Sequence, residues 1–406
     1  MTLTISDSGC EIVPAQECLI PGSVILPVVL QLLQPLPLTQ ILETYNLMTI
    51  PSGRLVYETK NFRGLWQPTV KSRSAGMRVC CMLMLAGLLS APNALAQTSG
   101  HAADKVRVAL IKMPFRGERN VPELSGGPDY LESGGIQKLL EQRGYQTKAI
   151  ATVALASDEE KAYGEWNRLA LANGELGRLV AKERRGGYLP VGLLANCSAL
   201  AGMLAGLQHS GPTARPLRLG LVYVDAHGDF NTPETTLSGM LGGMPVAIAS
   251  GMALTRMRLK AGLDPPIAPR NIAEACVRDT DPLEQDLLDR SQVQQLSVAD
   301  IRTRSEDLRK MMERLSQHSD VIYVHVDMDA LDQSEVPGHH LRVPGGPTSM
   351  ELAAALTEMF HYEKVAAFGV ASTPYGDNDK AGISRQAAYN LILGALKGIE
   401  ERSGDR

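Results

Sequence analysis

The sequence is poor in cysteine, nearly balanced in charge, and has no unbroken apolar run of membrane length in its first 76 residues. Six cysteines among 406 residues have no regular spacing, which argues against a disulfide framework. A formal net charge of −4 gives no indication of a nucleic-acid partner. The apolar run at 19–38 is broken repeatedly by proline, whereas a membrane-spanning helix needs about 20 uninterrupted apolar residues.

A short segment that begins at residue 77 has the pattern of a secretory signal peptide. Arg78 supplies a basic start, an apolar run extends from Val79 to Leu89, and small residues lead to a cleavage site after Ala96. An apolar core helix or a membrane anchor is the alternative interpretation. We therefore predict a signal peptide at 77–96 and a periplasmic or secreted protein.

A signal peptide belongs at a true N-terminus, so we predict that translation starts at Met77. Residues 1–76 would then be an over-extended start for which the sequence defines no structure, and the mature protein would be one catalytic domain at 97–406. Only Cys197 and Cys276 would remain, too few for a disulfide-rich secreted domain.

Strand and helix patterns alternate along the rest of the chain. Near-continuously apolar strands that alternate with amphipathic helices predict a parallel sheet covered by helices on both faces. The fold class we expect is α/β, a three-layer α/β/α sandwich with a mainly parallel sheet. We expect strands within 105–115, 188–198, 218–229, 270–282, 321–332 and 364–374, and helices within 127–145, 163–187, 199–211, 307–317, 349–362 and 385–402.

Two clusters of metal-binding residue types follow buried strands. Asp225, His227 and Asp229 alternate after one strand, and Asp327 and Asp329 have the same spacing after another. Alternate residues of an extended segment point the same way, and the carboxyl ends of parallel strands gather at one edge. Carboxylates packed together repel and require a cation, and this donor set suits hard or borderline divalent ions. Solvated turns are the alternative.

The same segments resemble those of a known family. DAHGDFNTPETTLSG at 225–239 and HVDMDALDQSEVPG at 325–338 resemble the two signature segments of the arginase/agmatinase (ureohydrolase) family. The resemblance covers nearly all of 105–400. It implies a three-layer α/β fold and two divalent metal ions, Mn²⁺ in this family. It also implies a homo-oligomer and a small guanidino or amidine substrate. We expect no nucleic-acid partner, and no membrane partner after signal cleavage.

The resemblance also implies a set of metal ligands. It assigns that role to four aspartates and to His227, which matches the histidine of the second metal. The aspartates are Asp225, Asp229, Asp327 and Asp329. Cys197 stands where the family has a second histidine. A thiolate binds metal but is softer than imidazole and favours Zn²⁺ or Fe²⁺. A buried cysteine without a metal bond and a cysteine nucleophile are the alternatives. The predicted ligands are Cys197, Asp225, His227, Asp229, Asp327 and Asp329.

Part of an arginase-like substrate pocket matches as well. Four positions match those that hold the carboxylate and amino group of the amino acid: Asn231, Ser238, Asp281 and Glu284. For the first two the alternative is stabilisation of a turn. For the last two it is a helix N-cap and its partner three residues later.

Three positions depart from the arginase pattern. Gly242 stands where arginases have a histidine, Met240 where they usually have asparagine, and Ala371 where they have the glutamate that pairs with the guanidinium. Loss of that carboxylate from a dry site should cost several kcal/mol. Of the loop pair His339 and His340 we predict that His340 is catalytic and replaces the missing histidine; a solvated pair is the alternative.

The family implies metal-assisted hydrolysis. The two ions lower the pKa of a shared water, and the hydroxide attacks the central guanidinium or amidine carbon. Asp229 would orient that hydroxide and pass its proton on. We therefore predict a metal-dependent hydrolase of a guanidino or amidine C–N bond that releases urea from arginine or a modified arginine. The alternative is a metal-binding protein of this fold without arginase activity.

Overall fold

The computed structural model describes residues 105–115 and 125–404, together with four short strands nearer the N-terminus. The chain divides into two units, Met1–Gln97 and Thr98–Arg406. In the first unit β1 (Thr2–Ser6) pairs antiparallel with β2 (Gly9–Val13), and β3 (Met48–Thr49) pairs antiparallel with β4 (Leu55–Val56). The predicted signal peptide at 77–96 lies outside the described residues. Within the described part, no helix has the length and apolar character to cross a membrane.

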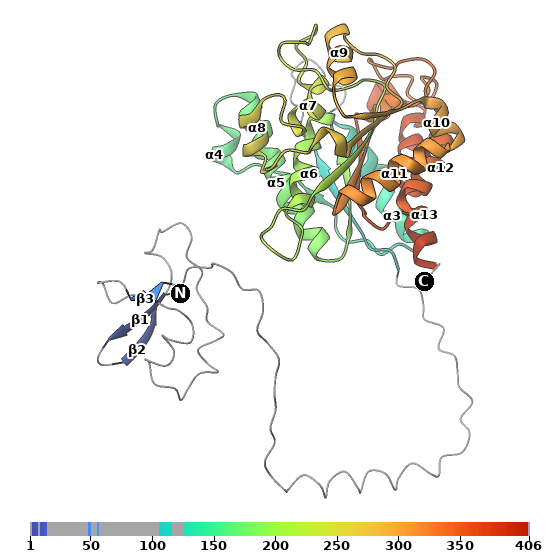
Figure 1. Cartoon of the computed structure of the whole chain (residues 1–406). Helices are drawn as coiled ribbons and strands as arrows, with labels where there is room; N and C mark the ends of the chain where they lie inside the picture. The colour runs from blue at the N-terminus through green and yellow to red at the C-terminus, as the bar shows by residue number, and fades with distance from the viewer. Residues whose placement is uncertain are drawn as a thin grey trace, which may run out of the picture. The chain divides into compact units, whose positions relative to one another are not determined.

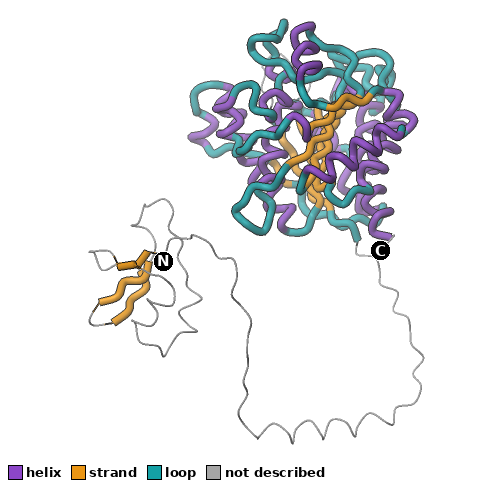
Figure 2. Tube along the Cα trace, in the orientation of Figure 1, coloured by secondary structure: helices purple, strands orange, loops and turns teal. Residues whose placement is uncertain are grey.

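The second unit is built on an eight-stranded sheet in which every adjacent pair of strands is parallel. The order across the sheet is β10-β9-β8-β11-β12-β7-β5-β6. Figure 2 shows the strands in orange, running through the middle of this unit among purple helices. This confirms the predicted fold class. The strands are β5 (Val108–Met113), β6 (Ala151–Thr152), β7 (Leu189–Leu194), β8 (Leu219–Val224), β9 (Ile272–Ala275), β10 (Gln294–Leu296), β11 (Val321–Asp327) and β12 (Val365–Ala371).

Helices cover both faces of this sheet (Figure 1). One apolar core joins the sheet to α2, α3, α10, α11, α12 and α13, and a second joins its other face to α5, α6, α7, α8 and α9. The helices are α2 (Gly127–Ser133), α3 (Ile136–Gln142), α4 (Ser157–Glu160), α5 (Glu165–Arg185), α6 (Leu200–Gln208), α7 (Pro245–Ala249), α8 (Thr255–Lys260), α9 (Pro282–Arg290), α10 (Val298–Thr303), α11 (Glu306–His318), α12 (Ser349–Phe360) and α13 (Ile383–Gly404).

The strands are apolar on both sides because both faces of the sheet are covered. In β8, Val222 and Val224 enter one core, whereas Leu221 and Tyr223 enter the other. Successive side chains of a strand point to opposite faces, so a strand buried on both sides reads as a continuous apolar run. All six residues of β8 are buried for this reason.

One predicted helix is two helices in the structure. The pattern at 127–145 is divided into α2 and α3 by Gly134 and Gly135, and Gly135 has a φ of 92°. Glycine adopts this left-handed conformation readily, and it turns the chain between the two helices. The short elements β6, α4, α7, α8, α9, β10 and α10 had no separate prediction.

A row of side chains crosses the sheet beneath the ligand-bearing strand ends. His325 of β11 lies in register with Tyr223 of β8 and Gly369 of β12. Its ring stacks on that of Tyr223, with centroids 4.9 Å apart, and its Nδ1 lies 2.9 Å from the Tyr323 hydroxyl. A Cβ at Gly369 would lie only 2.0 Å from that hydroxyl. Glycine at 369 therefore makes room for the Tyr323–His325 pair.

We predict that Gly369→Ala lowers the free energy of unfolding by about 1–3 kcal/mol, because the added methyl overpacks the row. Urea unfolding of both proteins measures the effect. In a Tyr323→Phe background, which lacks the clashing hydroxyl, the same substitution should cost less. An equal cost in both backgrounds would show that the hydroxyl is not what requires glycine.

Candidate metal centre

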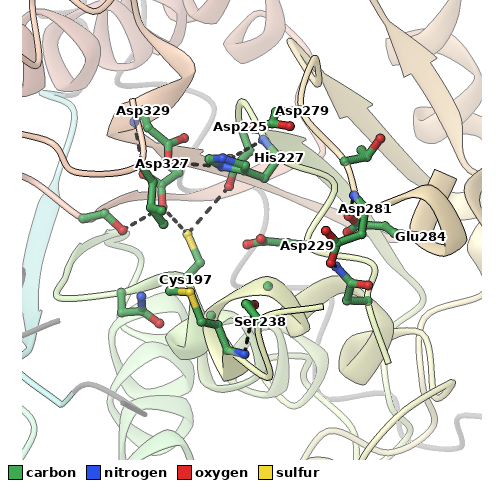
Figure 3. Close-up of a pocket in the computed structure, with 18 of the residues that line it drawn as sticks. Cys197, Asp225, His227, Asp229, Ser238, Asp279, Asp281, Glu284, Asp327 and Asp329 are labelled. Carbon is green, nitrogen blue, oxygen red and sulfur yellow. Dashed lines mark hydrogen bonds and ion pairs between the residues drawn. The ribbon is translucent and has the colours of Figure 1, made fainter. Parts of the chain in front are cut away.

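The candidate ligands lie at the carboxyl ends of three central strands. Cys197 begins the 3₁₀ turn η3 (Cys197–Ala199) after β7, and Asp225 follows β8 directly. Asp327 ends β11, and Asp329 lies in the next turn, η6 (Met328–Ala330). Figure 3 shows the Cys197 sulfur pointing toward Asp225 and Asp327. The predicted ligands therefore meet in space, although 130 residues separate Cys197 from Asp327 in the chain.

Backbone amides orient two of the carboxylates from within their own turns. The amide of His227 donates to Asp225 Oδ1 at 2.8 Å, and the amide of Asp329 donates to Asp327 Oδ1 at 3.1 Å. Each bond closes a turn of the type that aspartate favours at a strand end. These bonds fix one oxygen of each carboxylate and direct the other toward the pocket.

Asp229 is held by a residue of the strand that precedes it. Its backbone has a φ of 48°, which turns the chain out of the alternating segment, and its Oδ2 accepts a hydrogen bond from the buried Tyr223 hydroxyl. Its carbonyl accepts a bond from the amide of Val246 at 2.9 Å. A left-handed backbone is strained for a residue other than glycine, and such strain is concentrated at functional sites.

Cys197 packs among acceptors and one imidazole. Its thiol donates to Asp327 Oδ2 at 2.7 Å, and its sulfur lies 4.0 Å from Asp225 Oδ2 and 3.2 Å from His325 Nε2. The hydroxyl of Ser372, just after β12, donates to the same Asp327 oxygen at 2.6 Å. Cys197 is buried at 1% exposure. The sulfur therefore faces the carboxylates directly, as a ligand would.

Burial makes this concentration of negative charge unfavourable. Burial, followed by repulsion from Asp329, raises the pKa of Asp327 to about 7. Burial and a neighbouring carboxylate also raise the pKa of Asp225 and Asp329, and raise that of Asp229 well above its ordinary value. Burial and the nearby carboxylates raise the pKa of the Cys197 thiol well above its usual range. A bound cation relieves this repulsion.

His227 is the positive partner of this cluster in the protein alone. Its Nδ1 lies 3.3 Å from Asp225 Oδ1 and 3.3 Å from Asp329 Oδ2. Burial disfavours the charged imidazole, but hydrogen bonds to the two carboxylates outweigh burial and raise the pKa of His227 to about 12. A divalent ion would take the position of this positive charge between the same atoms.

The donor atoms fit divalent metal ions. Three overlapping groups of side chains bring their ligand atoms within 4.8 Å of one another. The combined set is rich in carboxylate oxygen and contains imidazole nitrogen and one thiol, which suits Mn²⁺ and, at the thiol, softer ions. The groups are Cys197, Asp225 and Asp229; Asp225, His227 and Asp329; and Asp327, Asp329 and His339.

The ligands line a pocket of about 250 Å³. Its other walls come from the loop after β8, from the segment before α9 and from the loop after β11. Among its described lining residues there is no lysine or arginine. Besides the six predicted ligands, the pocket is lined by Asn196, Asn231, Ser238, Met240, Gly242, Gly243, Asp279, Thr280, Asp281, Glu284, His339, Leu341 and Ser372.

The structure distinguishes the two neighbouring loop histidines. His339 is 1% exposed and lines the pocket, with ring nitrogens 3.9 Å from Asp327 Oδ1 and 3.8 Å from Asp329 Oδ2. His340 is exposed, does not line the pocket, and stacks on His339 with centroids 5.5 Å apart. The geometry thus gives the predicted catalytic role of His340 no support. Burial lowers the pKa of His339 to about 4, although Asp329 opposes the shift.

Comparison with known proteins agrees with this fold. The family model described as Arginase family matches residues 106–396, which is most of the chain. The chain belongs to the arginase family. This confirms the resemblance carried by the two signature segments.

Curated members of the arginase family are distant relatives of this chain. Arginase from Bacillus caldovelox is 28% identical over 258 residues, which cover 61% of this chain and 84% of that arginase. Human mitochondrial arginase-2 is 29% identical over 273 residues, which cover 63% of this chain and 75% of that protein. The family model establishes the family, and these identities do not identify the substrate.

Solved structures of the arginase family share the fold. Arginase from Bacillus subtilis matches with a TM-score of 0.63 and 23% identity, covering 72% of this chain and 98% of that one. Formimidoylglutamase from Bacillus subtilis subsp. subtilis str. 168 matches with a TM-score of 0.55 and 18% identity, covering 79% and 98%. At this identity the likeness concerns the fold alone.

The predicted substrate residues form one connected group beside the metal ligands. Asn231 Nδ2 donates to Asp281 Oδ2 at 3.2 Å, and the amide of Leu237 donates to the same oxygen at 2.9 Å. Asp281 is the N-cap residue of α9, and its amide donates to Glu284 Oε2 at 3.1 Å. Exposed Ser238 accepts from the amide of Met240 at 3.2 Å. All four line the pocket, and all four also serve the structural alternatives.

Sequence reasoning missed Ser372 and Asp279 as pocket residues. Ser372 lies near the end of the predicted strand at 364–374 and directly after β12, so the rule that functional groups gather at strand ends would have selected it. Asp279 forms an isolated parallel bridge with His227 and lies in a segment without secondary structure, so periodicity gives no signal for it.

We predict that the metal-free protein becomes less stable as pH rises from about 6.5 to about 8. The folded state retains a proton on His227, whose pKa is raised to about 12, while the unfolded chain releases that proton as the pH rises past the ordinary histidine pKa. Asp327, with a pKa of about 7, acts in the same direction in the lower part of this range. Urea unfolding in chelator measures the trend.

The control for this pH dependence is the protein saturated with Mn²⁺. The buried imidazoles of His325 and His339, whose pKa values are lowered to about 3 and about 4, are neutral in the folded protein, whereas the unfolded chain releases their protons around the ordinary histidine pKa, so they oppose the trend only at the lower end of this range. Metal binding favours deprotonated ligands, so Mn²⁺ should stabilise more at pH 8 than at pH 6.5. Stability of the metal-free form that rises with pH would contradict the charge cluster described above.

A second prediction concerns the Cys197 sulfur. Protein loaded with Co²⁺ should show a sulfur-to-metal charge-transfer band, and Cys197→Ala should lose the band and bind one ion more weakly, because a thiolate ligand is removed. Cys276→Ala is the matched control, since Cys276 is the other buried free cysteine in the described part of the chain and lies outside the pocket lining. Retained metal with lost activity in Cys197→Ala would instead support a nucleophile.

Proposed function

We propose that this protein is a metal-dependent hydrolase of a guanidino or amidine C–N bond. The observation that carries the proposal is the convergence of five oxygen and nitrogen ligands in one pocket of an arginase-family fold. These ligands are Asp225, His227, Asp229, Asp327 and Asp329. Four buried carboxylates at strand ends destabilise the protein by their repulsion, which gives the metal-binding interpretation its physical reason.

The charge of the pocket favours a cationic substrate. Asp279, Asp281 and Glu284 contribute carboxyl groups to its wall, whereas no lysine or arginine belongs to the described lining. A guanidinium or amidinium group is attracted by such a wall. A dicarboxylate such as formimidoylglutamate would find no cationic side chain among these residues to pair with. We therefore propose arginine or a modified arginine as the substrate in preference to formimidoylglutamate.

The residues of the pocket have distinct roles in the proposed reaction. Bound Mn²⁺ would supply a Lewis acid and lower the pKa of a coordinated water. Asp229, with one oxygen fixed by Tyr223, orients the attacking oxygen and accepts its proton. The hydroxyl of Ser372 holds one oxygen of Asp327 and so fixes the direction of that carboxylate. Urea or a related amide and an amine are the products.

A protein of this family without arginase activity is the second candidate. Ala371, at the position of the arginase glutamate, is fully buried at the end of β12 and is not part of the pocket lining. A guanidinium therefore lacks that carboxylate partner in this chain. The retained metal ligands favour the hydrolase, whereas Ala371 and Gly242 favour a changed substrate or a silent member.

Export and assembly are further proposals about the same protein. The signal pattern at 77–96 supports a periplasmic or secreted location, where the enzyme would act on external guanidino compounds. A homo-oligomer is proposed from the family alone. We propose two Mn²⁺ ions, with Cys197 tolerating softer ions at one of the two positions.

The decisive experiment measures urea release from L-arginine by the full chain loaded with Mn²⁺. We expect turnover that disappears with chelator and in Asp229→Asn, because the proton acceptor is lost. Formimidoylglutamate is the comparison substrate and should be hydrolysed more slowly. Two bound metal ions without turnover of L-arginine would reject the arginase assignment and direct the search to other guanidino and amidine compounds.

A further inference from the structure

The loop between β11 and α12 carries a buried histidine that the ligand assignment and the reaction above do not use. His339 is 1% exposed, and neither of its ring nitrogens has a hydrogen-bond partner among the described residues. Polar atoms taken out of water without a partner destabilise a protein, and buried side chains that do so require an explanation. The surroundings of the ring provide one.

Each ring nitrogen of His339 faces a different candidate ligand. Nε2 lies 3.9 Å from Asp327 Oδ1, and Nδ1 lies 3.8 Å from Asp329 Oδ2. Both separations are too long for hydrogen bonds. Two ligand atoms that share one ion at about 2.1 Å lie roughly 3 to 4.2 Å apart, depending on the angle at the metal. The separations are therefore those of groups that share an ion.

His227 and His339 differ in how closely their ring nitrogens approach the carboxylates. His227 Nδ1 approaches two carboxylate oxygens to 3.3 Å, as expected for an imidazolium attracted by both. His339 is more deeply buried and yet stays 0.5 Å or more farther from its carboxylates. Direct pairing with the carboxylates therefore does not account for its position.

The backbone around His339 is held so that the ring stays in place. Its amide donates to the Val336 carbonyl at 2.9 Å, and its own carbonyl accepts from Arg342 Nη1 at 2.9 Å. At Gly338 the chain passes so close to Asn378 that a Cβ would lie 2.0 Å from the Asn378 carbonyl oxygen. A side chain on a backbone fixed in this way is suited to metal coordination.

We propose that His339 is a ligand of the metal ion held by Asp327 and Asp329, so that the centre has a second imidazole besides His227. One ring nitrogen binds the ion in its neutral imidazole form, in keeping with the lowered pKa of this buried ring. The proposal concerns the centre of the proposed function but rests only on metal binding there, not on hydrolysis of any substrate.

The experiment compares Mn²⁺ binding to the metal-free full chain and to three variants by equilibrium dialysis. His339→Ala should raise the Kd for one Mn²⁺ at least about tenfold, since loss of even an outer partner costs about 10- to 100-fold. His227→Ala is the positive comparison. His340→Ala is the matched control from the same loop and should bind both ions as the wild type does, because His340 is exposed and outside the pocket.

A spectroscopic measurement makes the result independent of catalysis. In Mn²⁺-loaded protein labelled with ¹⁵N-histidine, the nitrogen coupling detected by pulsed electron paramagnetic resonance should fall in His339→Ala and remain in His340→Ala. If His339→Ala fails to fold, judged by circular dichroism, His339→Asn takes its place. Unchanged Mn²⁺ affinity and unchanged nitrogen coupling would overturn the proposal. Wild-type protein that binds two Mn²⁺ ions but hydrolyses nothing would instead reject the proposed function alone.

Discussion

Repulsion among four buried carboxylates is the constraint on which the rest of this site depends. Asp225, Asp229, Asp327 and Asp329 are each no more than 6% exposed and share one pocket. Taking even one charge out of water is unfavourable, and taking four neighbouring ones of the same sign is much more so. The fold places them together nonetheless, because β8 and β11 are neighbouring parallel strands that end at the same edge, and each carries two of the carboxylates at or just beyond its end. A bound divalent cation would offset this repulsion.

Much of the fold and of the metal centre could be predicted from the sequence, for a local reason. Apolar strands buried on both faces, such as the one at 219–224, read as continuous runs, and ligands at alternate positions after a strand follow from backbone geometry alone. Asp225, His227 and Asp229 needed only this rule and one buried strand. The family signature then added the position of Cys197, which no periodicity would have selected.

The remaining features depend on contacts between distant segments, which local patterns do not contain. Adjacent histidines at 339 and 340 are equivalent in the sequence, and only the path of the loop past Asn378 decides which one faces the carboxylates. Asp281 and Glu284 match substrate positions and also form the start of α9, so one pattern served two interpretations. Ser372 reaches Asp327 across 45 residues of chain. In each case tertiary contacts decide which residue reaches the pocket and what it contacts there.

Arg278 anchors the loop that carries Asp329 in a way that does not depend on the protonation of the nearby carboxylates. Its guanidinium donates to carbonyl oxygens and not to carboxylates: to Pro344 at 3.0 Å, Cys276 at 2.9 Å, Asp329 at 3.1 Å, Leu331 at 3.4 Å and Val343 at 2.9 Å. Carbonyls do not titrate, so this anchor is the same whatever the protonation or occupancy of the neighbouring ligands. The loop is thus preorganised, and an arriving ion has little chain entropy left to remove.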